Sequence, residues 1–202
     1  PNWSLWLRAT RDGYIDRSSS GNQFLRLRHE NGPESDVLLD LGNRTEGKYK
    51  LSFRLWTWTG YSGYYNIQHN NELNPANWAY HVQFINGKGN VRVGSFTQPI
   101  SVDSFDYQPN AWNYVEEIID LDENEVTLMI NQEVIGSWPF SRGSRGPEKR
   151  LGAIDFFANE AFNVQFLVDN ICLEALEPND PEPVLSNLVC ASRGEMTVDR
   201  TD

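Results

Sequence analysis

The chain has 202 residues, of which 39% are hydrophobic and 12% aromatic, and its 17 Lys and Arg against 28 Asp and Glu give a net charge of −11. This charge argues against binding to a nucleic-acid backbone, which requires clustered positive charge, and against binding to an anionic membrane surface. No apolar run is long enough to cross a bilayer, so no membrane insertion is expected. The length suits one β-domain followed by a linker or the start of another domain.

From the N-terminus, short segments of alternating polar and apolar residues are separated by turn residues such as Gly, Pro, Asn and Asp. In the first half of the chain the segments predicted as strands are 3–8, 14–15, 24–28, 37–41, 49–58, 64–69 and 78–85. A tight hairpin is predicted at 87–90. The remaining predicted strands are 91–93, 99–103, 112–121, 126–130, 133–140, 151–158 and 163–176.

None of these segments has a helical period. About a dozen short strands separated by turn signals predict an all-β fold, a two-sheet antiparallel β-sandwich or jelly roll, over residues 1–176. Residues 177–183, Glu-Pro-Asn-Asp-Pro-Glu-Pro, are predicted to form a stiff acidic linker. Residues 184–202 regain apolar character and are expected to be an ordered tail or the start of a further domain.

The chain has two cysteines, Cys172 and Cys190, and two interpretations of them stay open. They are either a disulfide, which would contribute about 3 kcal/mol of stability, or two free thiols with one of them buried in a strand.

Two segments resemble a known fold family. Trp112–Gly136 places a tryptophan before Val-Glu-Glu-Ile-Ile-Asp, then Asp-Glu-Asn, Val-Thr-Leu-Met-Ile-Asn and Val-Ile-Gly. This run resembles the back-sheet hairpin of concanavalin A-like lectin and glucanase β-sandwiches, particularly the laminin G-like group. Phe166–Glu174, Phe-Leu-Val-Asp-Asn-Ile-Cys-Leu-Glu, resembles the closing strand of such domains and of jelly-roll carbohydrate-binding modules.

A third segment, residues 60–69, resembles repeats of large secreted surface proteins of gliding-type bacteria. The resemblance covers about residues 23–176 and its motifs are mainly structural, so it specifies a fold more than an activity. It implies a concanavalin A-like sandwich with a carbohydrate-recognition or adhesion role, secreted or at the cell surface, beside other domains of the same parent chain.

The candidate site comes from the stretch 49–84, which contains three consecutive predicted strands. If these strands are sheet neighbours, one polar face carries rings for stacking on sugars and amides for their hydroxyls. The predicted carbohydrate-binding residues on this face are Trp56, Trp58, Tyr64, Asn66, Gln68, His81 and Gln83. The alternative is that a loop or a second sheet covers this face and the tryptophans belong to the core.

A glycoside hydrolase or polysaccharide lyase on the same fold is the second hypothesis, and it requires acids that face each other across a groove. Glu116 and Glu117 are adjacent and therefore point to opposite faces, and Asp155 is a lone acid within its strand. A non-catalytic binding module is accordingly favoured over an enzyme. The third hypothesis is a structural or protein-binding accessory domain.

No cofactor is expected to be required, although a structural Ca²⁺ is considered. Asp169, which precedes Asn170, resembles a position that binds calcium in some sandwich modules. Two acid pairs elsewhere are alternatives, namely Asp103 with Asp106 and Asp120 with Asp122.

A basic segment interrupts this acidic chain. Arg142, Arg145, Lys149 and Arg150 lie within ten residues, either as an ordinary exposed loop or as a contact for an acidic polysaccharide.

Overall fold

The computed structural model describes residues 3–5, 13–29, 35–71, 76–94, 100–158, 163–176 and 189–190. They form two antiparallel sheets, and the described part of the chain contains no helix. In spatial order, the seven strands of sheet A are β1 (Trp3–Leu5), β4 (Ser35–Arg44), β13 (Leu151–Ala158), β6 (Ser62–Gln68), β7 (Trp78–Ile85), β8 (Lys88–Val93) and β9 (Ile100–Asp106). The eight strands of sheet B are β12 (Glu133–Pro139), β11 (Glu125–Ile130), β10 (Trp112–Asp120), β5 (Lys48–Thr57), β14 (Gln165–Leu176), β3 (Gln23–Arg28) and β2 (Tyr14–Arg17), with β15 (Val189–Cys190) paired to β14.

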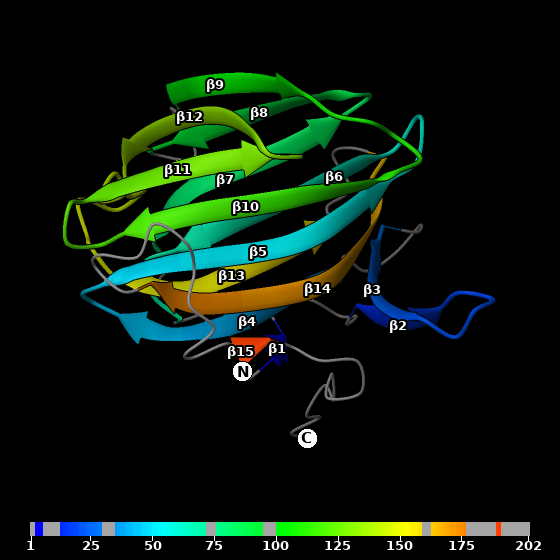
Figure 1. The fold of residues 1–202 in the computed structure, drawn as a ribbon, viewed down its shortest axis with the longest axis horizontal. Coiled ribbons are helices and arrows are strands. Elements are labelled where there is room, and N and C mark those ends of the chain that lie inside the picture. The colour runs from blue at the N-terminus through cyan, green and yellow to red at the C-terminus, as the bar shows by residue number, and fades with distance from the viewer. Residues whose placement is uncertain are drawn as a thin grey trace.

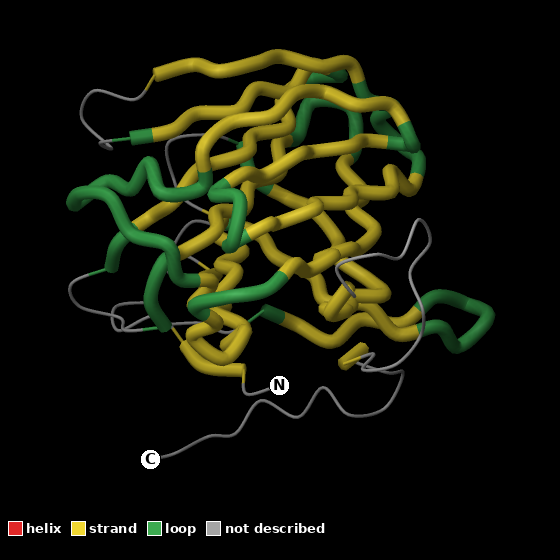
Figure 2. Tube along the Cα trace, turned by 60° about the vertical axis from the view of Figure 1, so that its left-hand side comes forward, coloured by secondary structure: helices red, strands yellow, loops and turns green. Residues whose placement is uncertain are grey.

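The two sheets stack face to face, with β10, β5 and β14 of sheet B in front of β7, β6 and β13 of sheet A (Figure 1). Figure 2 shows from a second direction that strands make up most of the described trace. The predicted all-β, two-sheet antiparallel sandwich is therefore confirmed. Among the described residues there is also no helix long and apolar enough to cross a membrane.

One expectation about strand order is wrong. The three consecutive strands of the stretch 49–84 are not all sheet neighbours, because β5 belongs to sheet B, where it pairs with β10 and β14. Only β6 and β7 are neighbours, in sheet A. The chain crosses from one sheet to the other in the turn between β5 and β6, where the Tyr61 amide donates to the Trp58 carbonyl. Alternation along a strand says which residues share a face but not which sheet holds the strand.

The predicted hairpin between β7 and β8 is present, but its loop is the two residues Asn86 and Gly87, two residues before the centre of the predicted turn 87–90. Asn86 and Gly87 both have positive φ angles, of 50° and 84°, as the central residues of a two-residue hairpin loop require. β8 accordingly begins at Lys88.

Aromatic rings from both sheets meet in the core between them. Phe53 of β5 packs edge-on against Tyr65 of β6 and Phe156 of β13, with ring centroids 5.0 and 5.4 Å apart. All three side chains are fully buried. The inward position of Tyr65 and Phe156 leaves their chain neighbours on the opposite, outward face of sheet A.

A carboxyl group crosses this apolar core. Glu117 of β10 is fully buried, and its two oxygens accept hydrogen bonds from the hydroxyls of Tyr65 and Tyr80, at 2.7 and 2.9 Å. Burial raises the pKa of Glu117 to about 7, although both hydroxyl donors act in the opposite direction. The three side chains connect β10 of sheet B to β6 and β7 of sheet A.

Cys172 is disulfide-bonded, and Cys190 is the only other cysteine in the sequence. The backbones of these residues stand opposite each other where β14 pairs with β15. This pairing attaches residues 189–190 to sheet B, whereas the predicted linker 177–183 and the rest of 184–202 lie outside the described residues.

The first prediction concerns the pH dependence of stability. Between about pH 4.5 and 7, Glu117 keeps its proton in the folded state and releases it in the unfolded state. The free energy of unfolding therefore falls as pH rises, and Glu117 contributes at most about 1.4 kcal/mol per pH unit to this slope. Glu117→Gln should remove this part of the slope, measured by urea unfolding at several pH values. Glu116→Gln, on the outward side of β10, is the matched control, and an unchanged slope in Glu117→Gln would contradict the prediction.

The second prediction concerns the disulfide. Reduction should lower the free energy of unfolding by about 3 kcal/mol, because it frees the unfolded chain from a closed loop. Denaturant unfolding with and without a phosphine reductant measures this difference. The Cys172→Ser, Cys190→Ser double variant should be equally destabilised and insensitive to the reductant; sensitivity of the double variant would contradict the assignment.

Candidate functional site

The outward surface of sheet A collects polar and aromatic side chains from three adjacent strands, and we call it the sheet A face. The register places His81 of β7 opposite Asn66 of β6, and Asn66 opposite Asp155 of β13. Tyr64 stands opposite Gln83 in the same way. The members of the face are Tyr64, Asn66, Gln68, Trp78, His81, Gln83, Asp155 and Phe157.

Five of the seven predicted site residues lie on this face, namely Tyr64, Asn66, Gln68, His81 and Gln83. Trp56 does not, because β5 belongs to sheet B, and Trp58, which follows β5, contacts Trp56. The expectation of one surface containing all seven residues is therefore wrong. The sandwich core separates the two groups.

Four rings follow one another across the sheet A face. Tyr64 contacts Phe157 on one side and His81 on the other, with ring centroids 6.3 and 5.9 Å apart. Trp78 continues the series, 5.9 Å from His81. Phe157, Tyr64 and Trp78 are each partly exposed, whereas His81 is buried. We call these four residues the ring row.

A chain of hydrogen bonds links the polar members of the face. The amide of Asn66 donates to Asp155 Oδ2 at 2.6 Å and lies 3.4 Å from the Tyr64 hydroxyl, to which it also donates. The Tyr64 hydroxyl is in turn in short contact with His81 Nδ1. A hydroxyl that accepts from Asn66 keeps its proton for Nδ1, which places the imidazole proton on Nε2.

The environment keeps Tyr64 and His81 uncharged at neutral pH. Burial, and then the positive charge of Arg92, lower the pKa of His81 to about 4. Burial and the neighbouring Asp155 raise the pKa of Tyr64. Burial raises the pKa of Asp155 to about 6, and hydrogen bonds from Asp36 and Asn66 oppose this rise. The centre of the face is therefore a set of neutral donors and acceptors beside one acidic group.

Several buried polar atoms of this face have no hydrogen-bond partner among the described residues. Both amide atoms of Gln68 are in this state, as are Asn66 Oδ1 and Gln83 Oε1. Buried polar groups are nearly always paired, and each unpaired group costs about 1–3 kcal/mol. These atoms are buried, so an external ligand can reach only the partly exposed members of the face, which are Tyr64, Trp78, Gln83 and Phe157.

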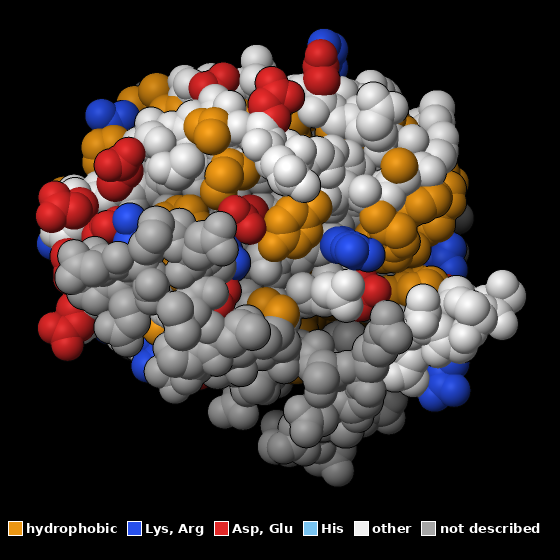
Figure 3. Space-filling view, viewed as in Figure 1, with side chains coloured by type: hydrophobic (Ala, Val, Ile, Leu, Met, Phe, Trp, Pro, Cys, Tyr) orange, Lys and Arg blue, Asp and Glu red, His pale blue; other side chains and the backbone are white. Residues whose placement is uncertain are grey.

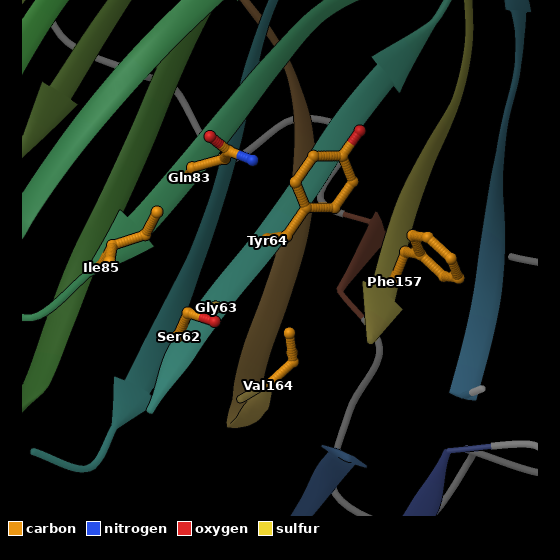
Figure 4. A pocket seen from close by; sticks show the side chains of 7 residues that line it. All are labelled: Ser62, Gly63, Tyr64, Gln83, Ile85, Phe157 and Val164. Carbon is orange, nitrogen blue, oxygen red and sulfur yellow. The ribbon is translucent and has the colours of Figure 1, made fainter. Parts of the chain in front are cut away.

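Figure 4 shows a small hollow at the end of this face, where Tyr64, Gln83 and Phe157 lie beside the ends of β6 and β7. Its volume of about 10 Å³ has room for about one water molecule. Recognition of a larger ligand here would rely on the surface of the ring row more than on a deep pocket.

The two remaining predicted residues belong to an aromatic cluster on the outward surface of sheet B. Trp56 lies 6.5 Å from Trp58 and 5.8 Å from Trp112 between ring centroids. The Arg26 guanidinium lies 5.5 Å from the centre of the Trp58 ring. Figure 3 shows hydrophobic side chains gathered toward the right of this face.

The two carboxyl groups of this face, Asp36 and Asp155, do not have the spacing of a glycoside hydrolase. The acid beside Asp155 is Asp36 of β4, and its side chain lowers the pKa of Asp155 through a hydrogen bond. Glycosidases hold their two carboxyl groups about 5–5.5 Å or about 6.5–9.5 Å apart, which leaves space for the sugar or for water. Two carboxyl groups close enough to share a hydrogen bond leave no such space between them.

The proposed calcium ligand remains a prediction. Asp169 accepts a hydrogen bond from the Asn170 amide at 2.8 Å, on β14 of sheet B. Of the alternatives, Asp106 pairs with Lys88 and Asp120 pairs with Lys48. Within the described ranges no group of three or more His, Cys, Asp or Glu side chains is placed to hold a metal ion.

Sequence reasoning missed the parts of the face that come from elsewhere in the chain. Asp155 and Phe157 lie about 90 positions after Asn66 and reach it only through the pairing of β13 with β6. The sequence signal for Asp155 is an acidic residue within an otherwise apolar predicted strand. Trp78 begins the predicted strand 78–85, but nothing in the sequence marks it as a member of the ring row.

No protein-family model matches the chain, and no curated protein matches it. Solved structures do match. A family 7 alginate lyase, A1-II′, superposes with a TM-score of 0.62 at 11% identity, over 86% of this chain and 95% of that one. The carbohydrate recognition domain of Emp46p gives 0.58 at 9% identity, over 85% and 88%.

A sialidase also matches, with a TM-score of 0.56 at 12% identity, over 86% of this chain but 17% of the sialidase. At these identities the likeness shows the fold alone. The chain has the fold of concanavalin A-like β-sandwiches, as the resemblance implied. The laminin G-like subgroup stays a prediction.

The third prediction tests the hydrogen-bond chain. Asn66→Leu should raise the pKa of Asp155 above 6, because the carboxylate loses a donor that favours its charged form. Carbon-detected NMR titration of the Asp side chains, with Asp155→Asn for assignment, measures this pKa. Gln68→Leu, two residues along the same strand, should leave it unchanged. A pKa that stays the same or falls in Asn66→Leu would contradict the proposed network.

Proposed function

We propose that this domain is a non-catalytic carbohydrate-binding or adhesion module and that its glycan lies along the sheet A face. The observation that carries the proposal is the ring row, which is flanked by amide side chains with unpaired polar atoms. Sugars present flat C–H faces that stack on aromatic rings and hydroxyls that pair with amides and imidazole. The partly exposed rings of Phe157, Tyr64 and Trp78 supply the first kind of contact.

The protonation states of the face suit this ligand. The partly exposed Tyr64 and Gln83 can each exchange a hydrogen bond with a hydroxyl group, and the buried, neutral His81 and Asn66 hold the Tyr64 hydroxyl in place. The fold adds general support, because the structures with similar folds include a carbohydrate recognition domain and a polysaccharide lyase.

One observation favours a second candidate function, catalysis on a bound polysaccharide. The Tyr64 hydroxyl and the neutral His81 imidazole are in hydrogen-bond contact, and such a pair can transfer a proton during an elimination reaction. A polysaccharide lyase would release unsaturated products from uronate polymers, detected by their ultraviolet absorbance. A glycoside hydrolase is disfavoured by the contact between Asp36 and Asp155.

We further propose that the domain is secreted or displayed at a cell surface, beside other domains of its parent chain. A disulfide at Cys172 supports an oxidising compartment. A structural or protein-binding accessory role is the remaining alternative, and it predicts no glycan affinity.

The fourth prediction tests the location of the glycan. On a glycan array and in affinity gels, Trp78→Ala should weaken binding about 10-fold or more, because it removes the terminal ring of the ring row. Tyr64→Phe, which keeps the ring and loses the hydroxyl, should weaken binding less. Trp58→Ala, on sheet B, is the matched control and should bind as the native domain does.

Two results would overturn the proposal. Loss of binding in Trp58→Ala with retention in Trp78→Ala would move the site to sheet B. Absence of binding to every glycan by the folded native domain would favour the accessory role.

A further inference from the structure

The loop that joins β12 to β13, residues 141–150, is attached to one end of the sheet A face, and we call it the basic loop. The Ser144 amide donates to the Trp78 carbonyl at 2.8 Å, and the Trp78 amide donates to Ser144 Oγ at 3.0 Å. The Arg145 amide donates to Asn77 Oδ1 at 2.9 Å. The loop is therefore bound to the residues that begin β7, where the ring row ends.

Close packing reinforces this attachment. A Cβ atom at Gly143 would lie 2.8 Å from both Asn77 Oδ1 and His69 Cδ2, so the loop backbone approaches the sheet as closely as glycine permits. The Asn77 side-chain amide also donates to Glu148 Oε2 at 2.9 Å. The basic loop is thus placed by its own contacts with the end of the site.

This loop concentrates positive charge in a chain whose net charge is −11. Arg142, Arg145 and Lys149 are exposed, and none of them forms an ion pair within the described part of the chain. Arg150 is paired with Glu148 of the same loop. Arg92 of β8, which stands opposite His81, adds an exposed cation beside the ring row.

The other end of the face has the opposite sign. Asp36 and Asp155, which share a hydrogen bond, lie beside Phe157, since Phe157 stands opposite Asp36 across the β13 and β4 pair. The ring row therefore runs from an acidic end at Phe157 to a basic end at Trp78. A neutral ligand would form no ion pair with the charged groups at either end of the ring row.

We propose that the glycan bound on the sheet A face is anionic and that its carboxylate or sulfate group lies at the Trp78 end, against the basic loop. This inference rests on the proposed function and adds the ligand's charge and its direction. Exposed arginines and lysines attract such groups while the rings stack on the sugar. The net negative charge of the rest of the chain repels a polyanion placed elsewhere.

The experiment measures the affinity of the native domain for charged oligosaccharides and for their neutral counterparts. The probes are oligogalacturonate with its methyl-esterified form, and a heparin oligosaccharide with its desulfated, carboxyl-reduced form. At least one charged probe should bind, with affinity that falls as salt rises, and its neutral counterpart should bind roughly 5- to 20-fold more weakly. The two pairs distinguish carboxylate from sulfate.

The variant for this test is Arg142→Ala with Lys149→Ala, because both side chains are exposed and no hydrogen bond or ion pair involves them within the described residues. It should lose roughly 5- to 20-fold in affinity for the charged probe and keep its affinity for the neutral one. Lys88→Ala is the matched control, since it removes one positive charge at the opposite end of β7 and β8. It should leave both affinities unchanged.

The outcomes separate this inference from the proposed function. Equal binding of charged and neutral probes that is lost in Trp78→Ala would overturn the charge inference and retain the glycan site. Equal affinity for a single-stranded oligonucleotide of the same charge, unaffected by Trp78→Ala, would indicate a general polyanion surface and overturn the inference. Absence of binding to every probe and every neutral glycan would contradict both proposals.

Discussion

The hydrogen bonds from Tyr65 and Tyr80 to Glu117 set the register on which the candidate site depends. A carboxyl group in an apolar core is costly unless it is hydrogen-bonded, so the two hydroxyls must reach the same side chain of β10. β6 and β7 are thereby held with Tyr65 and Tyr80 facing inward. Because side chains alternate along a strand, Tyr64 and His81 then face outward together.

The two outward surfaces of the domain differ in composition. Outside sheet A, the ring row lies among neutral polar groups, with Asp155 on one side and the basic loop at one end. Outside sheet B, the aromatic cluster around Trp56 packs mostly ring against ring. The sheet A face thus combines partly exposed rings for stacking with polar groups such as Tyr64 and Gln83, and sugars use both kinds of contact.

The sequence predicted the fold well because each strand carries its own period-two pattern. β10 is a clear case, since its side chains alternate between buried and partly buried at every residue. The pairing of β6 with β7 was also predictable from two alternating segments close together in the chain. The sheet that holds β5 was not, because an inward face of Leu51, Phe53 and Leu55 would pack equally well in either layer.

The site was predictable only where it is local in sequence. Two strands that are neighbours in the sequence, β6 and β7, supply Tyr64, Asn66, His81 and Gln83. Asp155 joins them only because β13 pairs with β6, which lies about 90 positions earlier in the chain. The position of the basic loop depends on Asn77 and Ser144, whose small polar side chains carry no pattern that links them. Long-range pairing and side-chain hydrogen bonds between loops are therefore what the sequence alone left undetermined.

The most direct test of a glycan site on the sheet A face is a crystal structure of the domain with the oligosaccharide that it binds most tightly. We predict sugar rings stacked along Phe157, Tyr64 and Trp78 on the sheet A face, with hydroxyls paired to the polar groups of that face. A sugar bound instead over Trp56 and Trp112 on sheet B would contradict it.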